Sequence, residues 1–286
     1  MVYDPNSKLE YIYFGETTTK THGLGDGVLL TAVVREINKK YPDKKIILRT
    51  VGPKEIYENN PRIHRVEHGV CGEDVGIQTF GIPIDSVIGG YFHLNKYGTV
   101  NRRGHFIDQK CAWFGIENAD ITPELFVSEK ETLAAQKTLE LLSGTKPVIM
   151  FCKSSTVPDR EWTIEGWINI IDMLKDKYDV YQLEETIRYD FYSGMPTRIM
   201  DTIPNARQEL RGLPIRKLIA IMSLSKKYLG VNTGLMPIAS AFSYDNIIYM
   251  KRNSAGDASW IFPKNNHFWE DWTVEQVQEL VKEKWL

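Results

Sequence analysis

Short apolar strands alternate with amphipathic helices along most of the chain, and this alternation limits the fold more than any other feature. Consecutive parallel strands need a helical crossover between them, so a β-α-β-α-β order favours a parallel sheet covered by helices. The first series of predicted strands and helices occupies residues 11–14, 26–40, 46–48, the segment after Pro53, and 65–66. The first half therefore predicts a doubly wound α/β domain.

The same pattern restarts after Lys146 and Pro147. The strands expected in this second half are residues 148–151, 180–183, 228–231 and 247–250, and the expected helices begin at Thr163, Pro214, Met236 and Thr273. Two such halves predict two Rossmann-like domains that turn the carboxyl ends of their sheets toward a shared cleft. We expect an N-terminal domain over residues 1–144, a C-terminal domain over 145–268, and a C-terminal helix over 269–286 that can pack back on the N-terminal domain.

The middle of the chain is less regular. Ser128 and Glu131 stand at the spacing of a capping box, which predicts a helix that ends near Gly144. The other elements expected here are strands at 86–88, 91–94 and 125–127 and a helix over 104–114. Several basic and aromatic residues of this region suit either an anionic acceptor or a solvated face, namely Lys96, Tyr97, Arg102, Arg103 and His105.

Charge and composition exclude several classes of protein. A formal net charge of −2 over 286 residues provides no basic field for nucleic acid. The three cysteines lie far apart without CxxC spacing, so neither a disulfide framework nor a zinc site is indicated. The first ten residues are polar, and no apolar run approaches the ~20 residues that span a bilayer. We therefore expect a cytoplasmic protein with at most peripheral membrane contact.

A glycine-rich turn joins the first predicted strand to its helix. It contains three glycines and one acid, namely Gly23, Gly25, Asp26 and Gly27. Glycines at such a turn let the backbone approach a ligand closely. The third glycine of a dinucleotide-binding fingerprint is replaced by Val28, however, and Arg49 ends the second strand where such folds carry an acid. A dehydrogenase is therefore disfavoured.

Other nucleotide and hydrolase motifs are absent from the sequence. It contains neither the P-loop pattern GxxxxGK[ST] nor GxSxG nor HExxH. It also lacks two aspartates at i and i+2, the pair with which an enzyme would hold a metal against a diphosphate. A bound diphosphate would then be neutralised by the protein itself, and we expect neither a metal nor a cofactor.

The second half contains residues suited to binding a diphosphate. Asn232, Thr233 and Gly234 follow a predicted strand and open a helix, where backbone N–H groups and the helix dipole favour an anion. Lys153 and Arg160 lie in the polar loop after the first strand of this half, and an arginine can hold a diphosphate with two hydrogen bonds. Two alternatives remain: Asn232 and Thr233 could simply cap the helix, and Arg160 could pair with a surface acid such as Glu161.

Four segments, taken in this order, resemble glycosyltransferase family 9, the heptosyltransferases. They are Gly25–Thr31, Asn60–Val66 with the preceding Tyr41-Pro42, Arg160-x-Trp162 with Trp167, and Val231–Ala239. The resemblance covers most of the chain but little of residues 69–114. It implies a GT-B fold, in which two Rossmann-like, doubly wound domains face each other across a cleft.

The resemblance also implies an activity. The family transfers a sugar from a nucleotide-diphosphate sugar, with inversion and without a metal, to a hydroxyl of a glycan or glycolipid, as in the synthesis of lipopolysaccharide or another surface glycan. An aspartate of the first glycine loop is its proposed general base, and Asp26 is the matching position. Gly23, Gly25 and Gly27 would then form the acceptor-side loop, while Asp26 could instead be a first-turn acid of the helix.

The chain also departs from the family's pattern. The usual Asp-Ser/Thr-Gly-Pro-Met-His is replaced by the six residues from Asn232 to Pro237, so an acid and a histidine are missing. The usual lysine before the tryptophan is Arg160. These changes leave the donor sugar open between heptose and another hexose-type sugar. They also leave two alternative functions open, a non-catalytic nucleotide-sugar-binding protein and a nucleotide-sugar epimerase.

Overall fold

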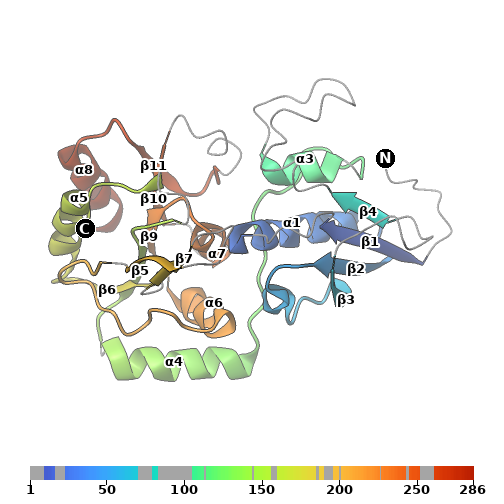
Figure 1. Ribbon diagram of the computed structural model, residues 1–286, viewed down its shortest axis with the longest axis horizontal. Helices are drawn as coiled ribbons and strands as arrows, with labels where there is room; N and C mark the ends of the chain where they lie inside the picture. Colours follow the sequence, from blue (N-terminus) through green and yellow to red (C-terminus); the bar gives the residue numbers. More distant parts are fainter. Residues whose placement is uncertain are drawn as a thin grey trace. The chain divides into compact units, whose positions relative to one another are not determined.

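The chain divides into two compact units. The computed structural model describes residues 10–16, 23–69, 79–82, 105–112, 114–143, 145–155, 160–184, 187–189, 196–199, 201–225, 227–242, 245–251 and 261–286. The first unit runs to Phe126, and the second contains most of the chain from Val127 onward. Figure 1 shows the helices and strands of each unit.

The first unit is built on a four-stranded parallel sheet with the strand order β3-β2-β1-β4. Its strands are β1 (Tyr11–Glu16), β2 (Lys45–Thr50), β3 (Ile63–His68) and β4 (Thr79–Ile82), and its helical segments are α1 (Leu24–Lys40), the 3₁₀ helix η1 (Lys54–Tyr57) and α3 (Phe106–Ala112). Gly15 lets β1 and β2 pair closely, because a Cβ there would collide with the carbonyl oxygen of Arg49. The predicted first strands and helices are thus confirmed.

Helix α1 forms because apolar residues recur along it at helical spacing. Val28, Leu29, Val33 and Ile37 are all fully buried. Lys39 and Lys40 occupy the last turn, where a positive charge favours the carboxyl end of the helix dipole. The helix that leaves the glycine turn therefore belongs to the core of the first unit and fixes the turn at its amino end.

The second unit contains a five-stranded parallel sheet with the strand order β11-β10-β9-β5-β6. Its strands are β5 (Val148–Cys152), β6 (Asp179–Gln182), β9 (Tyr228–Val231), β10 (Ile247–Met250) and β11 (Asn266–Trp269), and a separate antiparallel pair is formed by β7 (Ile187–Tyr189) and β8 (Pro196–Ile199). Its helices are α4 (Glu129–Ser143), α5 (Ile164–Leu174), α6 (Ile215–Leu224), α7 (Leu235–Phe242) and α8 (Val274–Trp285). The predicted strands and helices of the second half are confirmed.

Aromatic and aliphatic side chains form the core of the second unit. Helices α5 and α8 pack together against the sheet, while α4 packs along α6 (Figure 1). Trp167 is fully buried with its ring 5.1 Å from that of Phe151. From α8, Val277, Val281 and Trp285 enter this core.

The boundaries of the units differ from those drawn from the sequence. The sequence places the helix after Ser128 in a first domain that ends at residue 144, whereas α4 belongs to the second unit. The Arg216 guanidinium on α6 donates twice to Glu131 on α4, with both distances 2.7 Å. The C-terminal helix was expected to be able to pack on the N-terminal domain, but its apolar face is used in the core of the second unit.

One predicted strand is wrong, and four strands were not predicted. Residues 125–127 form no strand, because the segment before them is held to α1 by side chains rather than by a ladder. Arg35 donates to the carbonyls of Asp120 and Thr122, and Thr31 accepts from the N–H of Glu124. The strands expected at 86–88 and 91–94 lie outside the described residues, and the unpredicted strands are β4, β7, β8 and β11.

Each sheet has a point at which the chain changes its direction of winding. The strands that follow β1 lie on one side of it as β2 and β3, while β4 lies on the other. In the second unit, β6 lies on one side of β5, and β9, β10 and β11 lie on the other. Ligands of open α/β sheets bind outside the carboxyl ends of the strands at such points. A ligand site is therefore expected at the carboxyl ends of β1, β5 and β9.

Candidate functional site

Asp26 lies in the first turn of α1, at the carboxyl side of β1. Gly23 is the N-cap, and its carbonyl accepts from the N–H of Asp26 at 3.1 Å. A Cβ at Gly23 would lie 3.0 Å from Oδ2 of Asp26, so the carboxylate folds back over the start of the helix. A negative charge is favoured at that end of the helix dipole. The first-turn position is thus observed, and it is compatible with a second role as a base because the residue is only partly buried.

The glycine turn is also constrained by close packing. A Cβ at Gly27 would lie 2.9 Å from Cδ1 of Ile56 and 3.1 Å from the hydroxyl of Tyr57. Glycine at this position therefore lets η1 pack against the first turn of α1. Gly25 is buried as well. The turn that presents Asp26 is accordingly held from two sides, by its own helix and by η1.

Two buried basic residues belong to α3 and its start, and one of them lies near Asp26. Lys110 is 4% exposed, and burial lowers its pKa to about 7 although the nearby Asp26 carboxylate opposes that change. His105 is also buried, and its Nδ1 accepts from the N–H of Ile107 at 3.2 Å. Burial lowers the pKa of His105 to about 4. Of the five basic and aromatic residues singled out in the sequence, His105 is therefore not on a solvated face, and the other four lie outside the described residues.

In the second unit, the loop after β5 meets the turn between β9 and α7. The Nη1 of Arg160 donates to the carbonyl of Asn232 at 3.4 Å. The N–H of Asn232 donates to Tyr249 of β10, and Thr233 and Gly234 complete the turn into α7. The structure thus brings together four residues that the sequence predicted to bind a diphosphate.

The guanidinium of Arg160 keeps capacity for a ligand. Its Nε is shielded from solvent and makes no hydrogen bond to any residue that the structure describes. A buried N–H group without a partner is costly, and an anion would satisfy it. The hydrogen bond that Arg160 makes goes to the main-chain carbonyl of Asn232. It is not a bond to Glu161, the acid considered as an alternative partner.

Trp162 fixes the position of Arg160. Its ring packs edge-to-face on Trp167 at 4.9 Å and on Phe268 at 5.0 Å. A Cβ at Gly166 would lie 2.6 Å from this indole, so the glycine makes room for it. Because Trp162 belongs to the core, it holds the backbone next to Arg160 in a fixed position.

Lys153 and Glu184 lie at the carboxyl edge of the same sheet. Lys153 follows β5 directly and is 4% exposed. Glu184 follows β6, and its Oε2 is shielded from solvent without a hydrogen-bond partner among the described residues. Burial raises the pKa of Glu184, while its bond to Gln182 and the charges of Lys153 and Arg211 oppose that rise.

Glu184 is a candidate that was not predicted from the sequence. The signal is an acid after the second strand of a β-α-β unit, where dinucleotide-binding folds hold a ribose hydroxyl. In the first half, Arg49 ends the second strand at the corresponding position. The corresponding position of the second half is occupied by Glu184, after β5, α5 and β6.

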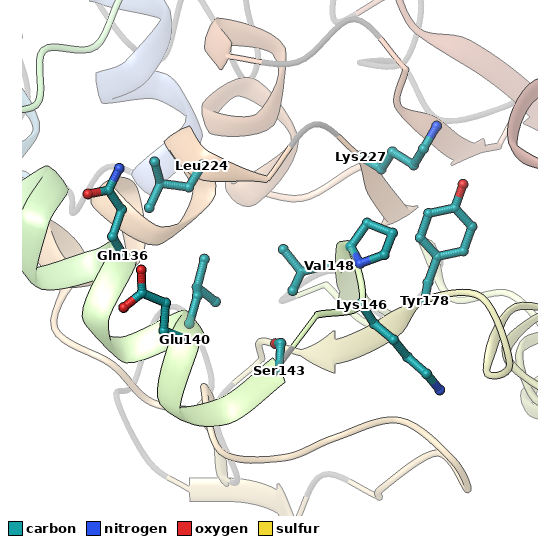
Figure 2. A pocket seen from close by; sticks show the side chains of 10 residues that line it. Gln136, Glu140, Ser143, Lys146, Val148, Tyr178, Leu224 and Lys227 are labelled. Carbon is teal, nitrogen blue, oxygen red and sulfur yellow. The ribbon is translucent and has the colours of Figure 1, made fainter.

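A cavity of about 560 Å³ in the second unit lies elsewhere (Figure 2). Its lining includes Val148 at the start of β5, Lys227 before β9 and Tyr178 before β6. These positions mark the amino edge of the sheet, and neither Arg160 nor Asn232 lines the cavity. Because ligands of such sheets bind at the carboxyl edge, we assign the candidate site to that edge.

The described residues hold no cluster of three or more histidine, cysteine or acidic side chains that could bind a metal ion. Within the same ranges, none of the helices is both long and apolar enough to cross a membrane. Cys111 and Cys152 are free and buried, and burial raises the pKa of Cys111 to about 12. Cys111 is therefore an unreactive thiol at neutral pH.

Comparison with known proteins places the chain among glycosyltransferases. Residues 95–249, more than half of the chain, match the model of glycosyltransferase family 9 (heptosyltransferase). None of the curated protein sequences matches the chain. The match confirms the resemblance drawn from the four sequence motifs.

Solved structures of similar proteins cover nearly the whole chain. The glycosyl transferase family 9 protein from Veillonella parvula DSM 2008 aligns with a TM-score of 0.66 at 15% identity, over 96% of this chain and 88% of that protein. The E. coli ADP-heptose LPS heptosyltransferase II aligns with a TM-score of 0.63 at 14% identity, over 96% and 98%. The E. coli heptosyltransferase WaaC, solved with ADP, aligns with a TM-score of 0.60 at 12% identity, over 96% and 99%. These likenesses confirm the predicted α/β fold of GT-B type, and with the family match they show that the chain belongs to glycosyltransferase family 9.

Proposed function

We propose that the protein transfers a sugar, a heptose or another hexose-type sugar, from a nucleotide-diphosphate sugar to a hydroxyl of a glycan or glycolipid. The observation that carries this proposal is the meeting of Arg160 with the Asn232–Gly234 turn at the amino end of α7. A cation and a helix amino terminus at one point form a binding place for phosphate. The site lies at the carboxyl ends of β5 and β9, where this fold binds ligands.

The donor's diphosphate would be held without a metal. The guanidinium of Arg160 and the backbone N–H groups after Asn232 would donate to phosphate oxygens, and Lys153 would supply a second positive charge. These donors would also stabilise the charge that develops on the departing nucleoside diphosphate. Glu184 would accept hydrogen bonds from hydroxyls of the ribose, which would satisfy its Oε2.

The acceptor would be activated by the first unit. Asp26 would take the proton of the acceptor hydroxyl as that oxygen attacks the anomeric carbon. A single displacement of this kind inverts the configuration at that carbon. The buried Lys110, within electrostatic reach of Asp26, would favour the ionised carboxylate that a base requires.

The solved relatives suggest which donor to test first. One of them is an ADP-heptose heptosyltransferase and another was solved with ADP. We therefore take ADP as the first nucleotide and ADP-heptose as the first donor. Arg160 and Asn232 replace the lysine and the acid usual in the family, so donors with another sugar belong in the same panel. We propose that the reaction takes place in the cytoplasm. A lipid-linked acceptor would bring the protein into peripheral contact with the membrane.

The experiment measures donor binding first and transfer second. ADP, GDP, UDP and CDP are titrated into the full chain, with thermal unfolding and calorimetry as readouts, since a bound nucleotide raises the unfolding temperature by mass action. Transfer from ADP-heptose to a purified glycolipid is then followed with and without EDTA, and the anomeric configuration of the product is determined by NMR.

We expect at least one nucleoside diphosphate to bind, transfer to be insensitive to EDTA, and the product to be inverted. Failure of all four nucleotides to bind would refute the proposed donor class. Nucleotide binding without nucleotide release would favour a non-catalytic binding protein. Conversion of the donor sugar without any acceptor would favour an epimerase.

A further inference from the structure

Four side chains next to the candidate site form a closed ring of hydrogen bonds. Gln182 Nε2 donates to Glu184 Oε1 at 2.6 Å, and Gln208 Nε2 donates to Gln182 Oε1 at 3.0 Å. Arg211 Nη1 donates to Gln208 Oε1 at 3.1 Å, and Arg211 Nε donates to the main-chain carbonyl of Glu184 at 2.9 Å. The ring therefore begins and ends on Glu184, which it holds by both its side chain and its main chain.

The orientation of the Gln182 amide is fixed by main-chain groups. Its Oε1 accepts from the N–H of Ile203 at 3.0 Å, and its Nε2 donates to the carbonyl of Asp201 at 3.0 Å. A backbone N–H can only donate and a carbonyl can only accept, so these two bonds define which end of the amide is which. Gln182 is 0% exposed. Its nitrogen accordingly donates to Glu184 and to the carbonyl of Asp201, and it cannot exchange places with the oxygen.

This arrangement divides the two oxygens of Glu184 between protein and ligand. Oε1 receives the N–H of Gln182, while Oε2 has no partner within the described parts of the chain. The Cys152 thiol is a hydrogen-bond neighbour of this carboxylate, and Tyr228 and Lys153 lie within electrostatic reach of it. When one oxygen of a carboxylate is held by a hydrogen bond, the lone pairs of the other oxygen point in a fixed direction. A fixed acceptor direction is what recognition of a hydroxyl requires.

We propose that Gln182 is a positioning residue, which with Gln208 and Arg211 presents Oε2 of Glu184 to the vicinal hydroxyls of the donor's ribose. The proposal rests on the function proposed above and adds to it how the ribose is distinguished from a deoxyribose. A site built to hydrogen-bond a hydroxyl rejects the analogue that lacks it, because its buried acceptor is then left unpaired. A loosely held carboxylate would lose part of that discrimination.

The test compares each ribonucleotide with the analogue that lacks both hydroxyls. ADP, GDP and UDP and their 2′,3′-dideoxy counterparts are titrated calorimetrically into the full chain. In the wild type, we expect the ribonucleotide to bind roughly tenfold to a hundredfold more tightly, the effect of a hydrogen bond to a charged group. Glu184→Ala should reduce this ratio to about one.

Two substitutions address Gln182 itself. Gln182→Met keeps the length of the side chain but removes its donor and acceptor, and Gln182→Glu replaces the donor by a repelling oxygen. Both should reduce the ratio at least several-fold toward that of Glu184→Ala. Gln208→Met, which breaks a more distant bond of the ring, should reduce it less and provides the second variant should Gln182→Met not fold.

The matched control is Asn265→Ala, which breaks a different buried amide network of the same unit, between Asn246, Asn265 and Ser240. It should lower stability and leave the ratio unchanged, so a change of ratio separates positioning from general destabilisation. The proposal is overturned if the Gln182 and Gln208 variants keep the wild-type ratio while Glu184→Ala loses it. A wild type that binds ribonucleotide and dideoxynucleotide equally would overturn the role of Glu184 and leave the proposed function standing, whereas no binding at all would overturn both.

Discussion

Arg160 reaches across the carboxyl edge of the second sheet and donates from Nη1 to the carbonyl of Asn232 at 3.4 Å. This long hydrogen bond joins the loop after β5 to the turn between β9 and α7. A bond of this length is near the limit for N–H···O geometry, and the buried Nε of the same guanidinium has no hydrogen-bond partner among the described residues. The pair therefore forms a clamp that a phosphate group could complete.

Replacing Arg160 should weaken the binding of nucleoside diphosphates. Hydrogen bonds to a charged group contribute about 1.5–3 kcal/mol each, so Arg160→Ala should reduce affinity by roughly tenfold to a hundredfold in calorimetry. Arg160→Lys keeps the charge but loses the planar fork, and its affinity should be intermediate. Arg207→Ala is a matched control, because that arginine already pairs with Glu209 at 2.8 Å. Equal affinities for wild type and Arg160→Ala would remove Arg160 from the site.

Replacing Asp26 should separate catalysis from donor binding. Asp26→Asn keeps the shape of the side chain and removes the base, so kcat should fall by about 10²–10⁴-fold while the affinity for the nucleoside diphosphate is retained. Loss of the negative charge at the start of α1 should also cost about 0.3–1 kcal/mol of stability, which urea unfolding measures. The control is Asp43→Asn, at an exposed aspartate just after the same helix. A variant with wild-type kcat would leave Asp26 with its helix role alone.

Local signals in the sequence predicted most of the elements that the structure contains. Thr163 caps α5 by accepting from the N–H of Gly166, and Thr273 with Gln276 forms a capping box at the start of α8. Each signal works within three or four residues of chain, so it can be read without knowledge of the fold. Arg160 and the Asn232 turn could also be predicted, for a different reason. Both follow strands of one parallel sheet, and the carboxyl ends of such strands lie at the same edge.

Features that depend on contacts between distant residues could not be predicted. Strand β11 has only its Phe268 fully buried, and it forms because β10 offers a free edge for parallel pairing. Lys110 and the Oε2 atom of Glu184 are buried, and no local pattern of charges in the sequence reveals this burial. The strand predicted at 125–127 has a suitable apolar composition, but Arg35 and Thr31 bind the backbone just before it by side-chain bonds.

The pair of Glu131 and Arg216 should contribute measurably to the stability of the second unit. Glu131 accepts from Arg216 twice at 2.7 Å and also from the N–H of Ser128 at 2.8 Å. These bonds lower its pKa to about 2, so the stabilisation is complete above the ordinary pKa of 4.5 and is lost as the pH falls from there toward 2.

Substitution isolates that contribution. Glu131→Gln should reduce the free energy of unfolding at pH 7 by about 1–3 kcal/mol, because Arg216 loses the charge of its partner while it stays half-buried. Denaturation by urea measures the change, with Glu129→Gln, an exposed acid of the same helix, as the control. The loss should shrink between pH 4.5 and pH 2; an equal loss at both would mean that the charge is not the cause.

Buried histidines should make the protein less stable in mild acid. Burial lowers the pKa of His105 in the first unit and of His267 in the second to about 4, from an ordinary value of 6.5. Between pH 4 and 6.5 the unfolded chain therefore binds more protons than the folded one, and the free energy of unfolding rises with pH over that window. The histidines act between pH 4 and 6.5, whereas Glu131 acts mostly below that range, between pH 2 and 4.5, so the two effects can be separated by pH.

His105→Asn tests the part that comes from the first unit. Neutral His105 accepts from the N–H of Ile107 at Nδ1, and a proton on that nitrogen would remove the acceptor. Asparagine can accept the same bond and does not titrate. The free energy of unfolding should therefore fall less in the variant than in the wild type between pH 6.5 and pH 4.5, and the two falls should differ by about 1–2 kcal/mol. Urea denaturation at several pH values measures this slope, and His64→Asn, at an exposed position of β3, should leave it unchanged. An unaltered slope in His105→Asn would show that the acid sensitivity arises elsewhere, with His267 as the next residue to replace.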